Sequence, residues 1–183
     1  MKRIYLDNQT ATRASEGVIK GMIPFYREYF ADVMSPYTPA QEQIPFIEKA
    51  YASLYKLLGA KKEDTIAFCS SGAEAVNQVV LAAYLDITRK SGKNHFVTSK
   101  IDEAPVIMAM HRLEPLGTLV KFADVEKSGA VSKKTIQEAI TPRTALISLS
   151  WANGLTGVIN PVQEIAAVCK ERGILQRYCY IQL

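Results

Sequence analysis

The segment at residues 68–77, FCSSGAEAVN, constrains what this chain can fold into more than any other. This segment is preceded by an apolar run at residues 65–68, which is typical of a buried strand. It is followed by apolar residues at helical spacing. Ser70, Ser71 and Gly72 allow a sharp turn, a positive φ at the glycine and a close approach of the backbone to a ligand. Free N–H groups and the positive dipole end of a helix form an anion site, usually for phosphate. A structural turn without a ligand is the alternative interpretation.

The rest of the chain alternates between strand and helix patterns. Helices are predicted at residues 16–30, 47–58, 74–89, 104–113, 135–140 and 161–172, and strands at 65–69, 95–99, 118–123, 144–150 and from residue 174. Pro24 could kink the first helix, Gly59 and Gly173 are expected C-caps, and Asn160 is the expected N-cap before Pro161. The alternation predicts an α/β fold with a mainly parallel sheet and helices on both of its faces.

Three loops in this pattern each follow a predicted strand, at residues 70–73, 101–103 and 151–157. Ligands of parallel sheets lie at the carboxyl ends of the strands. We therefore expect the three loops to share one pocket.

Composition excludes several classes of protein. The chain has 183 residues, one domain or part of a larger one, with 48% apolar and 22% charged residues. No apolar run is long enough for a membrane span, and no apolar segment typical of a signal peptide follows the basic start. The net charge of +4 is dispersed, which argues against nucleic-acid binding. Three cysteines without paired spacing, Cys69, Cys169 and Cys179, suggest a reducing cytoplasm, and no metal-ligand spacing occurs.

Four segments resemble, in order and spacing, a known enzyme family: YLDNQTAT at residues 5–12, SSGAEAVN at 70–77, SKIDEAPVIMAMHRLE at 99–114 and TALISLSWANGLTGVINP at 144–161. Together they resemble the NifS-like cysteine desulfurases of the class V pyridoxal-phosphate aminotransferases. The resemblance runs from Tyr5 to about Leu175 and corresponds to somewhat under half of a family member. It implies the N-terminal part of a fold-type I large domain at residues 1–175, an incomplete domain, and a divergent tail at 176–183.

The resemblance also implies a cofactor, pyridoxal 5'-phosphate. Ser71, Gly72 and Ala73 match the turn that holds its phosphate, although Ala73 stands where the family has a threonine hydroxyl. Asn153 matches an asparagine that hydrogen-bonds the phenolic oxygen of the cofactor. The alternative is that Asn153 only forms a common Asn-Gly turn with Gly154 and has no role in cofactor binding.

Two departures from the family bear on activity. Glu103 stands at the position of the histidine that stacks on the cofactor ring, and a carboxylate does not stack like imidazole; a plain helix start is the favoured interpretation of Asp102 and Glu103. Cys179 stands at the position of the aspartate that pairs with the pyridine nitrogen. The Schiff-base lysine and the persulfide-forming cysteine have no counterpart in the chain. Catalytic residues therefore stay unassigned, and covalent attachment of the cofactor is not expected.

The function implied by the resemblance is removal of sulfur from L-cysteine, giving alanine and an enzyme persulfide, within iron–sulfur cluster assembly. The resemblance also implies a homodimer, and the composition described above predicts a cytoplasmic protein without nucleic-acid or membrane partners. This chain alone is expected to lack the activity, as a truncated or frame-shifted copy. The alternatives are a non-catalytic remnant or partner-binding subunit, and another class V enzyme such as an aminotransferase or selenocysteine lyase. An unrelated nucleotide-binding module is disfavoured, because neither G-x-G-x-x-G nor a Walker-type motif occurs.

Overall fold

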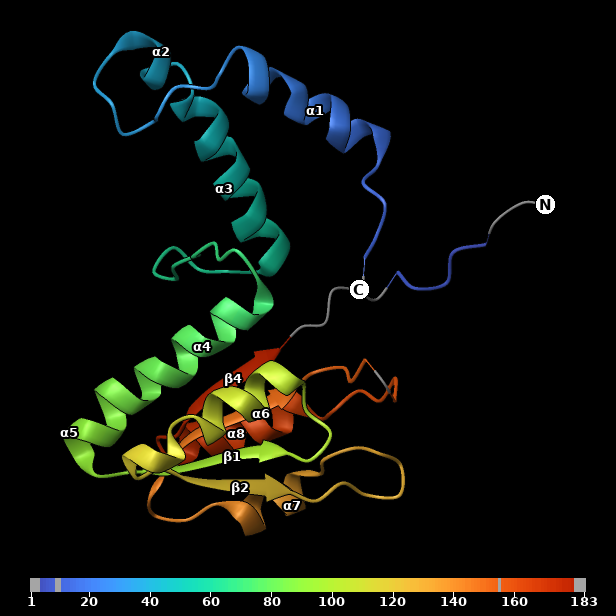
Figure 1. The fold of residues 1–183 in the computed structure, drawn as a ribbon, viewed down its shortest axis with the longest axis vertical. Coiled ribbons are helices and arrows are strands. Elements are labelled where there is room, and N and C mark those ends of the chain that lie inside the picture. Colours follow the sequence, from blue (N-terminus) through green and yellow to red (C-terminus); the bar gives the residue numbers. More distant parts are fainter. Residues whose placement is uncertain (1–3, 9–10, 155, 180–183) are drawn as a thin grey trace. The chain divides into compact units, whose positions relative to one another are not determined.

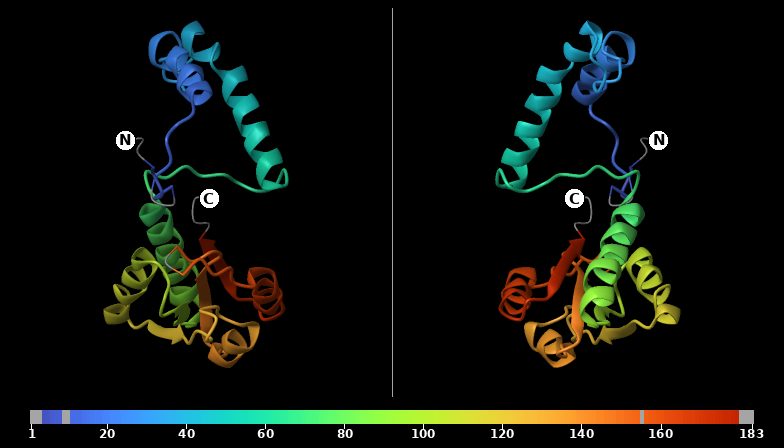
Figure 2. Two further views of the ribbon diagram at one scale, coloured as in Figure 1. Left: turned by 90° about the vertical axis from the view of Figure 1, so that its right-hand side faces the viewer. Right: turned by 90° about the vertical axis from the view of Figure 1, so that its left-hand side faces the viewer.

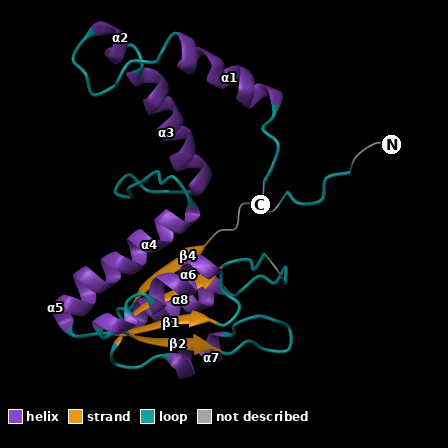
Figure 3. Ribbon diagram, viewed as in Figure 1, coloured by secondary structure: helices purple, strands orange, loops and turns teal. Residues whose placement is uncertain are grey.

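The computed structural model describes residues 4–8, 11–154 and 156–179, and the chain divides into two compact units (Figure 1). The first unit ends at Phe68 and the second begins at Cys69. Figure 3 shows helices and loops in the first unit and a sheet with packed helices in the second.

Helices form the first unit: α1 (Glu16–Arg27), the short α2 (Thr38–Gln41) and α3 (Ile44–Leu58). Ser15 caps α1, because its hydroxyl accepts a hydrogen bond from the Val18 N–H. The helix continues for three residues past Pro24 and ends before the predicted residue 30. Gly59 closes α3 with a φ of 62°, as the sequence predicts.

The first unit has little interior of its own. No residue of α1 or α3 is buried. Its contacts are aromatic: Phe25, Tyr29 and Phe46 form a cluster with ring centroids 4.8–5.7 Å apart. The apolar faces of both helices therefore remain largely exposed in this unit.

The predicted strand at residues 65–69 is wrong, because these residues form no strand. Phe68 is 71% exposed, and its ring lies edge-on to Tyr51 at 5.9 Å between centroids. A strand needs a neighbour for its backbone N–H and C=O groups, and within the described sheet no strand pairs with this run. An apolar pattern alone does not supply that partner.

The second unit begins with a long helical segment and then alternates. The segment comprises α4 (Gly72–Ala82), the π-helical η1 (Ala83–Thr88) and α5 (Arg89–Ser91). The other elements are β1 (His95–Ser99), α6 (Ala104–His111), η2 (Glu114–Leu116), β2 (Leu119–Ala123), α7 (Lys133–Ala139), β3 (Thr144–Ser150), α8 (Val162–Glu171) and β4 (Leu175–Cys179). The predicted strands 95–99 and 144–150 are confirmed with their bounds, and the strands predicted at 118–123 and from 174 each begin one residue later.

The four strands form one sheet in the order β2-β1-β3-β4, and every pair is parallel. The predicted parallel α/β sheet is therefore confirmed. β4 is in register with β3 from Leu146–Leu175 to Ser150–Cys179, so it crosses the proposed boundary at residue 175 without a break. Residues 180–183 of the expected tail lie outside the described residues. The division of the chain at residue 175 stays a prediction.

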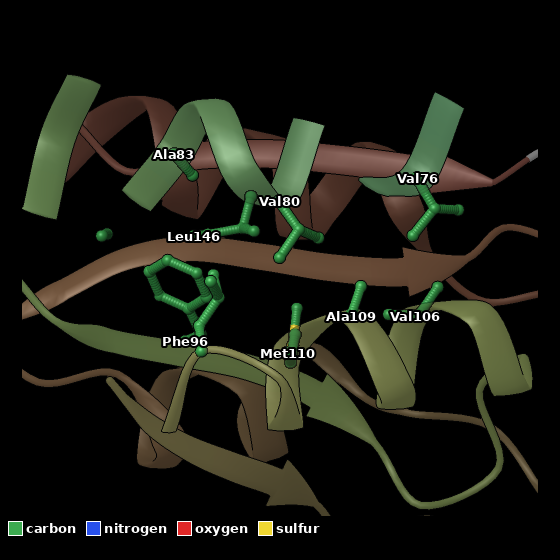
Figure 4. Close-up of a cluster of buried hydrophobic side chains, with 10 residues drawn as sticks. Val76, Val80, Ala83, Phe96, Val106, Ala109, Met110 and Leu146 are labelled. Carbon is green, nitrogen blue, oxygen red and sulfur yellow. The ribbon is translucent and has the colours of Figure 1, made fainter. Parts of the chain in front are cut away.

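Each face of the sheet carries its own apolar cluster, and the two helix layers lie on opposite sides of the strands (Figure 2). Phe96 and Leu146 point to one face, and their sequence neighbours Val97 and Ile147 point to the other. The first face is covered by α4 and α6, through residues such as Val80 and Met110 (Figure 4). The second face is covered by α7 and α8, through Ile136, Ile165 and Cys169.

Asn160 does not cap α8, contrary to the sequence prediction. The N-cap residue is Pro161, which makes no side-chain cap. The Asn160 amide instead donates to the Ser150 carbonyl at 2.8 Å and accepts from the Val131 N–H at 2.8 Å. Its side chain joins two buried backbone segments, a role that needs tertiary contacts and that a local cap pattern cannot reveal.

His95 makes the stability of the second unit depend on pH. Its Nδ1 lies 2.9 Å from the Thr144 hydroxyl, and burial, followed by the charge of Lys121, lowers its pKa from the ordinary value of 6.5. The native state therefore binds fewer protons than the unfolded state, so stability is complete above pH 6.5 and falls as pH drops toward the lowered pKa.

We expect a lower urea midpoint at about pH 5.5 than at about pH 7.5, and a smaller difference in His95→Asn. His111→Asn is the matched control, because His111 lies on a helix surface beside Glu114. An equal pH dependence in wild type and His95→Asn would contradict the assignment.

Candidate functional site

The carboxyl ends of the strands form the candidate site. Residues 101–103 follow β1 and residues 151–157 follow β3. α4 and α6 begin near this edge: in Figure 4, Val76 and Val106 lie toward the arrowhead of β3, and Ala83 lies toward its other end. The three expected loops therefore lie toward the same edge of the sheet, although residues 70–73 follow no strand.

Ser71 starts α4 as its N-cap. It has an extended backbone (φ −160°, ψ 161°), and its hydroxyl accepts a hydrogen bond from the Glu74 N–H at 3.2 Å. Glu74 turns back and accepts from both the hydroxyl and the N–H of Ser70, each at 2.6 Å. These bonds, the side-chain bond above all, lower the pKa of Glu74, so it is charged at neutral pH.

The first two helical N–H groups remain available at this terminus. Among the described residues, no acceptor hydrogen-bonds to the N–H of Gly72 or Ala73. The Glu74 carboxylate accepts from the Ser70 N–H, and the Ser71 hydroxyl accepts from the Glu74 N–H. The positive φ that a glycine allows is not used at Gly72, which is not among the glycines with positive φ. A Cβ atom at this position would meet no atom within 4 Å, so the backbone is open to a ligand.

Asn153 lies on the β3 loop and is 4% exposed. Its Nδ2 donates to the Ile101 carbonyl at 2.6 Å, which joins the loops after β1 and β3. Its Oδ1 accepts from the N–H and the hydroxyl of Thr156 at 3.0 and 3.1 Å. Gly157, with a φ of 70°, returns the chain through a hydrogen bond to the Asn153 carbonyl. Asn153 therefore stabilises the conformation of this loop through its own hydrogen bonds.

Asp102 is the site residue that sequence reasoning missed. It is 7% exposed, and its carboxylate accepts three hydrogen bonds: from Thr98 at 3.0 Å, from Ser150 at 2.5 Å and from the Glu103 N–H at 2.8 Å. From the sequence alone, Asp102 was interpreted only as an acidic residue that precedes a helix. Its contact with Ser150 spans 48 positions, so no local signal reveals it.

Glu103 is the N-cap residue of α6, with φ −65° and ψ 144° and without a side-chain cap bond. This position agrees with the plain helix start that the sequence favoured. Its side chain is partly buried at the same edge as Asn153.

A hollow of about 700 Å³ lies between α4 and α6, lined by Ala73, Asn77, Ala104 and Arg112 among others. Ala73 and Ala104 are at the beginnings of the two helices, so the α4 turn and the loop after β1 open onto the same hollow. None of the described hollows contains all three predicted loops. The loop at residues 101–103 is joined to the loop at residues 151–157 by hydrogen bonds and not by a shared cavity.

Three further residues of the second unit, Cys169, His111 and Lys100, have structural roles. Burial raises the pKa of Cys169 to about 11, so its thiol stays protonated in the core. His111 pairs with Glu114 and lies against the Phe122 ring. Lys100 pairs with Asp124 at 2.6 Å at the surface. In the part of the chain that the structure describes, no cluster of side chains could hold a metal ion and no helix could cross a membrane.

Comparison with known proteins gives these features a family context. The family described as "Aminotransferase class-V" matches residues 4–177. The cysteine desulfurase of Gluconacetobacter diazotrophicus is 34% identical over 176 residues, which are 96% of this chain and 43% of that protein. The chain thus spans less than half the length of this curated relative.

Solved structures agree with the sequence comparison. A NifS-like protein, 28% identical, superposes with a TM-score of 0.91 over 100% of this chain and 50% of that one. "SspA in complex with cysteine", 27% identical, superposes with a TM-score of 0.82 over 93% of this chain and 48% of the other. The expected incomplete large domain of the fold-type I transferases is confirmed. The chain belongs to the class-V aminotransferase family.

Proposed function

We propose that this chain supplies the phosphate-binding helix and the adjoining loops of a pyridoxal-phosphate enzyme that acts on L-cysteine. The observation that carries the proposal is the start of α4, where the N–H groups of Gly72 and Ala73 have no acceptor among the described residues. A phosphate there would be stabilised by these donors and by the helix dipole. Family membership and similarity to a protein described as a cysteine desulfurase support the choice of cofactor and substrate.

The residues of this edge fit the phosphate end of the cofactor better than its ring. Ser71 holds the turn open, and Gly72 and Ala73 would hold the phosphate, although Ala73 offers no hydroxyl. Asn153 would orient the ring hydroxyl with its amide, whereas Glu103 cannot stack on the ring. When bound, pyridoxal phosphate supplies an electron sink for negative charge on an amino-acid carbon. We assign this chain binding and orientation, and no covalent link to the cofactor.

The proposal extends to cellular context. The chain would act in the cytoplasm, in a homodimeric assembly, and complete sulfur removal from L-cysteine would need residues that it does not contain. A second candidate, a non-catalytic cofactor- or partner-binding subunit, is favoured by one observation: Glu103 stands where the resemblance implies a stacking histidine.

Binding can be followed through Trp151, the only tryptophan, at the start of the β3 loop. We expect pyridoxal phosphate to quench its emission, pyridoxal without phosphate to do so much more weakly, and inorganic phosphate to compete. Equal binding of the two pyridoxal compounds would contradict a site built on the α4 terminus. Borohydride reduction and mass mapping, which should label no lysine stoichiometrically, test the expected lack of a covalent link.

Gly72→Asp is expected to weaken pyridoxal-phosphate binding at least about tenfold, because a carboxylate beside a dianion costs more than 1.4 kcal/mol. The change should not unfold the helix, since a Cβ at residue 72 meets no neighbour and an acid in the first turn is favourable. Gly17→Asp, the same change in the first turn of α1, is the matched control. Equal affinities in both variants would remove Gly72 from the site.

A further inference from the structure

The polar residues beneath the candidate site form one buried network around Asp102. Asp102 comes directly after Ile101, whose carbonyl accepts from Asn153, and its own partner Ser150 ends β3 directly before the Asn153 loop. Thr98, Ser150 and Asn153 are all at most 4% exposed. The two loops are thus joined at two successive positions, by a carboxylate–hydroxyl bond and an amide–carbonyl bond.

The three donors to Asp102 come from different parts of the fold. Thr98 lies on β1, Ser150 at the end of β3, and the Glu103 N–H at the start of α6. A buried carboxylate is costly unless such donors satisfy it. Apolar residues could fill the space, but they could not fix three backbone segments at once.

We propose that Asp102 is a positioning residue, whose carboxylate holds the loops after β1 and β3 so that Asn153 faces the bound cofactor. This inference rests on the proposed function for the identity of the ligand. Asp102 itself touches Thr98, Ser150 and Glu103, so it acts through these residues and not on the reacting atoms. Among the described residues, the hydrogen bonds of Ser70, Ser71 and Glu74 at the start of α4 are local and do not reach this network.

The two ends of the site can therefore be separated by ligand. In Asp102→Ala, affinity for pyridoxal phosphate should fall about tenfold or more, since one lost hydrogen bond to a charged group already corresponds to that factor. Affinity for inorganic phosphate, which needs only the α4 terminus, should not change. Equal losses for both ligands, or no loss for either, would overturn the positioning role.

Asp102→Asn is the conservative control. Its Oδ1 can still accept from Ser150 and the Glu103 N–H, and its Nδ2 can donate to the Thr98 hydroxyl, which is both donor and acceptor. We expect this variant to recover most of the affinity that Asp102→Ala loses. Failure to recover it would mean that the charge, and not the geometry, is what the ligand requires, and would overturn the proposal.

A readout without cofactor separates this inference from the proposed function. If wild type binds neither ligand, the proposed function fails, and amide hydrogen exchange of residues 151–158 decides on Asp102. Faster exchange there in Asp102→Ala, restored in Asp102→Asn, supports the positioning role; a change confined to residues 102–103 overturns it. If Asp102→Ala does not fold, Ser150→Ala removes only the Ser150–Asp102 bond, leaves the Asn153–Ile101 bond in place and is judged by the same two criteria.

Discussion

The isolated chain is expected to associate in solution, because much of the apolar surface of its first unit has no cover. α1 exposes Val18, Ile19, Met22 and Tyr26, and α3 exposes Leu57, which is 80% accessible. Neither helix has a buried residue. Contiguous apolar surface of this kind drives association or aggregation. Size exclusion with light scattering, over a range of concentrations, should show species larger than the monomer and a broad thermal transition.

Paired substitutions identify the cause. Ile19→Gln with Met22→Gln should shift the population toward monomer, because it removes apolar surface from α1 without adding charge. Lys20→Gln with Glu28→Gln, which leaves the apolar residues in place, is the control. A compact wild-type monomer with a sharp cooperative melt would show that the exposed faces do not govern the behaviour of the chain.

Loss of the sheet core should have the largest effect on stability. Leu146 on β3 and Phe96 on β1 are fully buried on the face covered by α4 and α6 (Figure 4). Leu146→Ala should lower the free energy of unfolding by about 2–5 kcal/mol and Phe96→Ala by about 3–5 kcal/mol, through lost burial and the cavity left behind. For a domain with about 5–15 kcal/mol of stability, either change approaches unfolding.

Leu119→Ala is the matched control, since Leu119 is on the neighbouring strand β2 but is 56% exposed. It should lower the free energy of unfolding, measured by urea denaturation, by no more than about 1 kcal/mol. Comparable losses in Leu119→Ala and Leu146→Ala would mean that the difference in burial between these two side chains does not govern stability.

The central strands were predictable because their signal is local and strong. Thr144–Ser150 contains the apolar run ALISL and is buried at every residue, and His95–Ser99 is buried at every residue after His95. The run at residues 65–68 has a similar composition, but strand formation depends on a partner that the local pattern cannot specify. Composition therefore predicts strands reliably only where the topology also brings them a neighbour.

For the candidate site, the sequence indicated the position of the turn, while its role in binding a cofactor stays a prediction. Ser71 and the open N–H groups of Gly72 and Ala73 follow from a local cap pattern, and the structure places them at the start of α4. The network of Asp102 depends on β1 and β3 being adjacent, so Thr98 and Ser150 gave no sign of it in the sequence. Asn160 shows the reverse error, because a plausible local cap is used for a long-range contact instead.

The strand order β2-β1-β3-β4 bears on how the chain can acquire its sheet during synthesis. β2 joins β1, β3 then joins the other side of β1, and β4 joins β3, so each new strand meets an edge that already exists. No strand has to insert between two others. Since a domain leaves the ribosome N-terminus first, at about 5–20 residues per second, the sheet can grow outward in chain order. Each intermediate is then a smaller parallel sheet, in which each added strand already pairs with a neighbour.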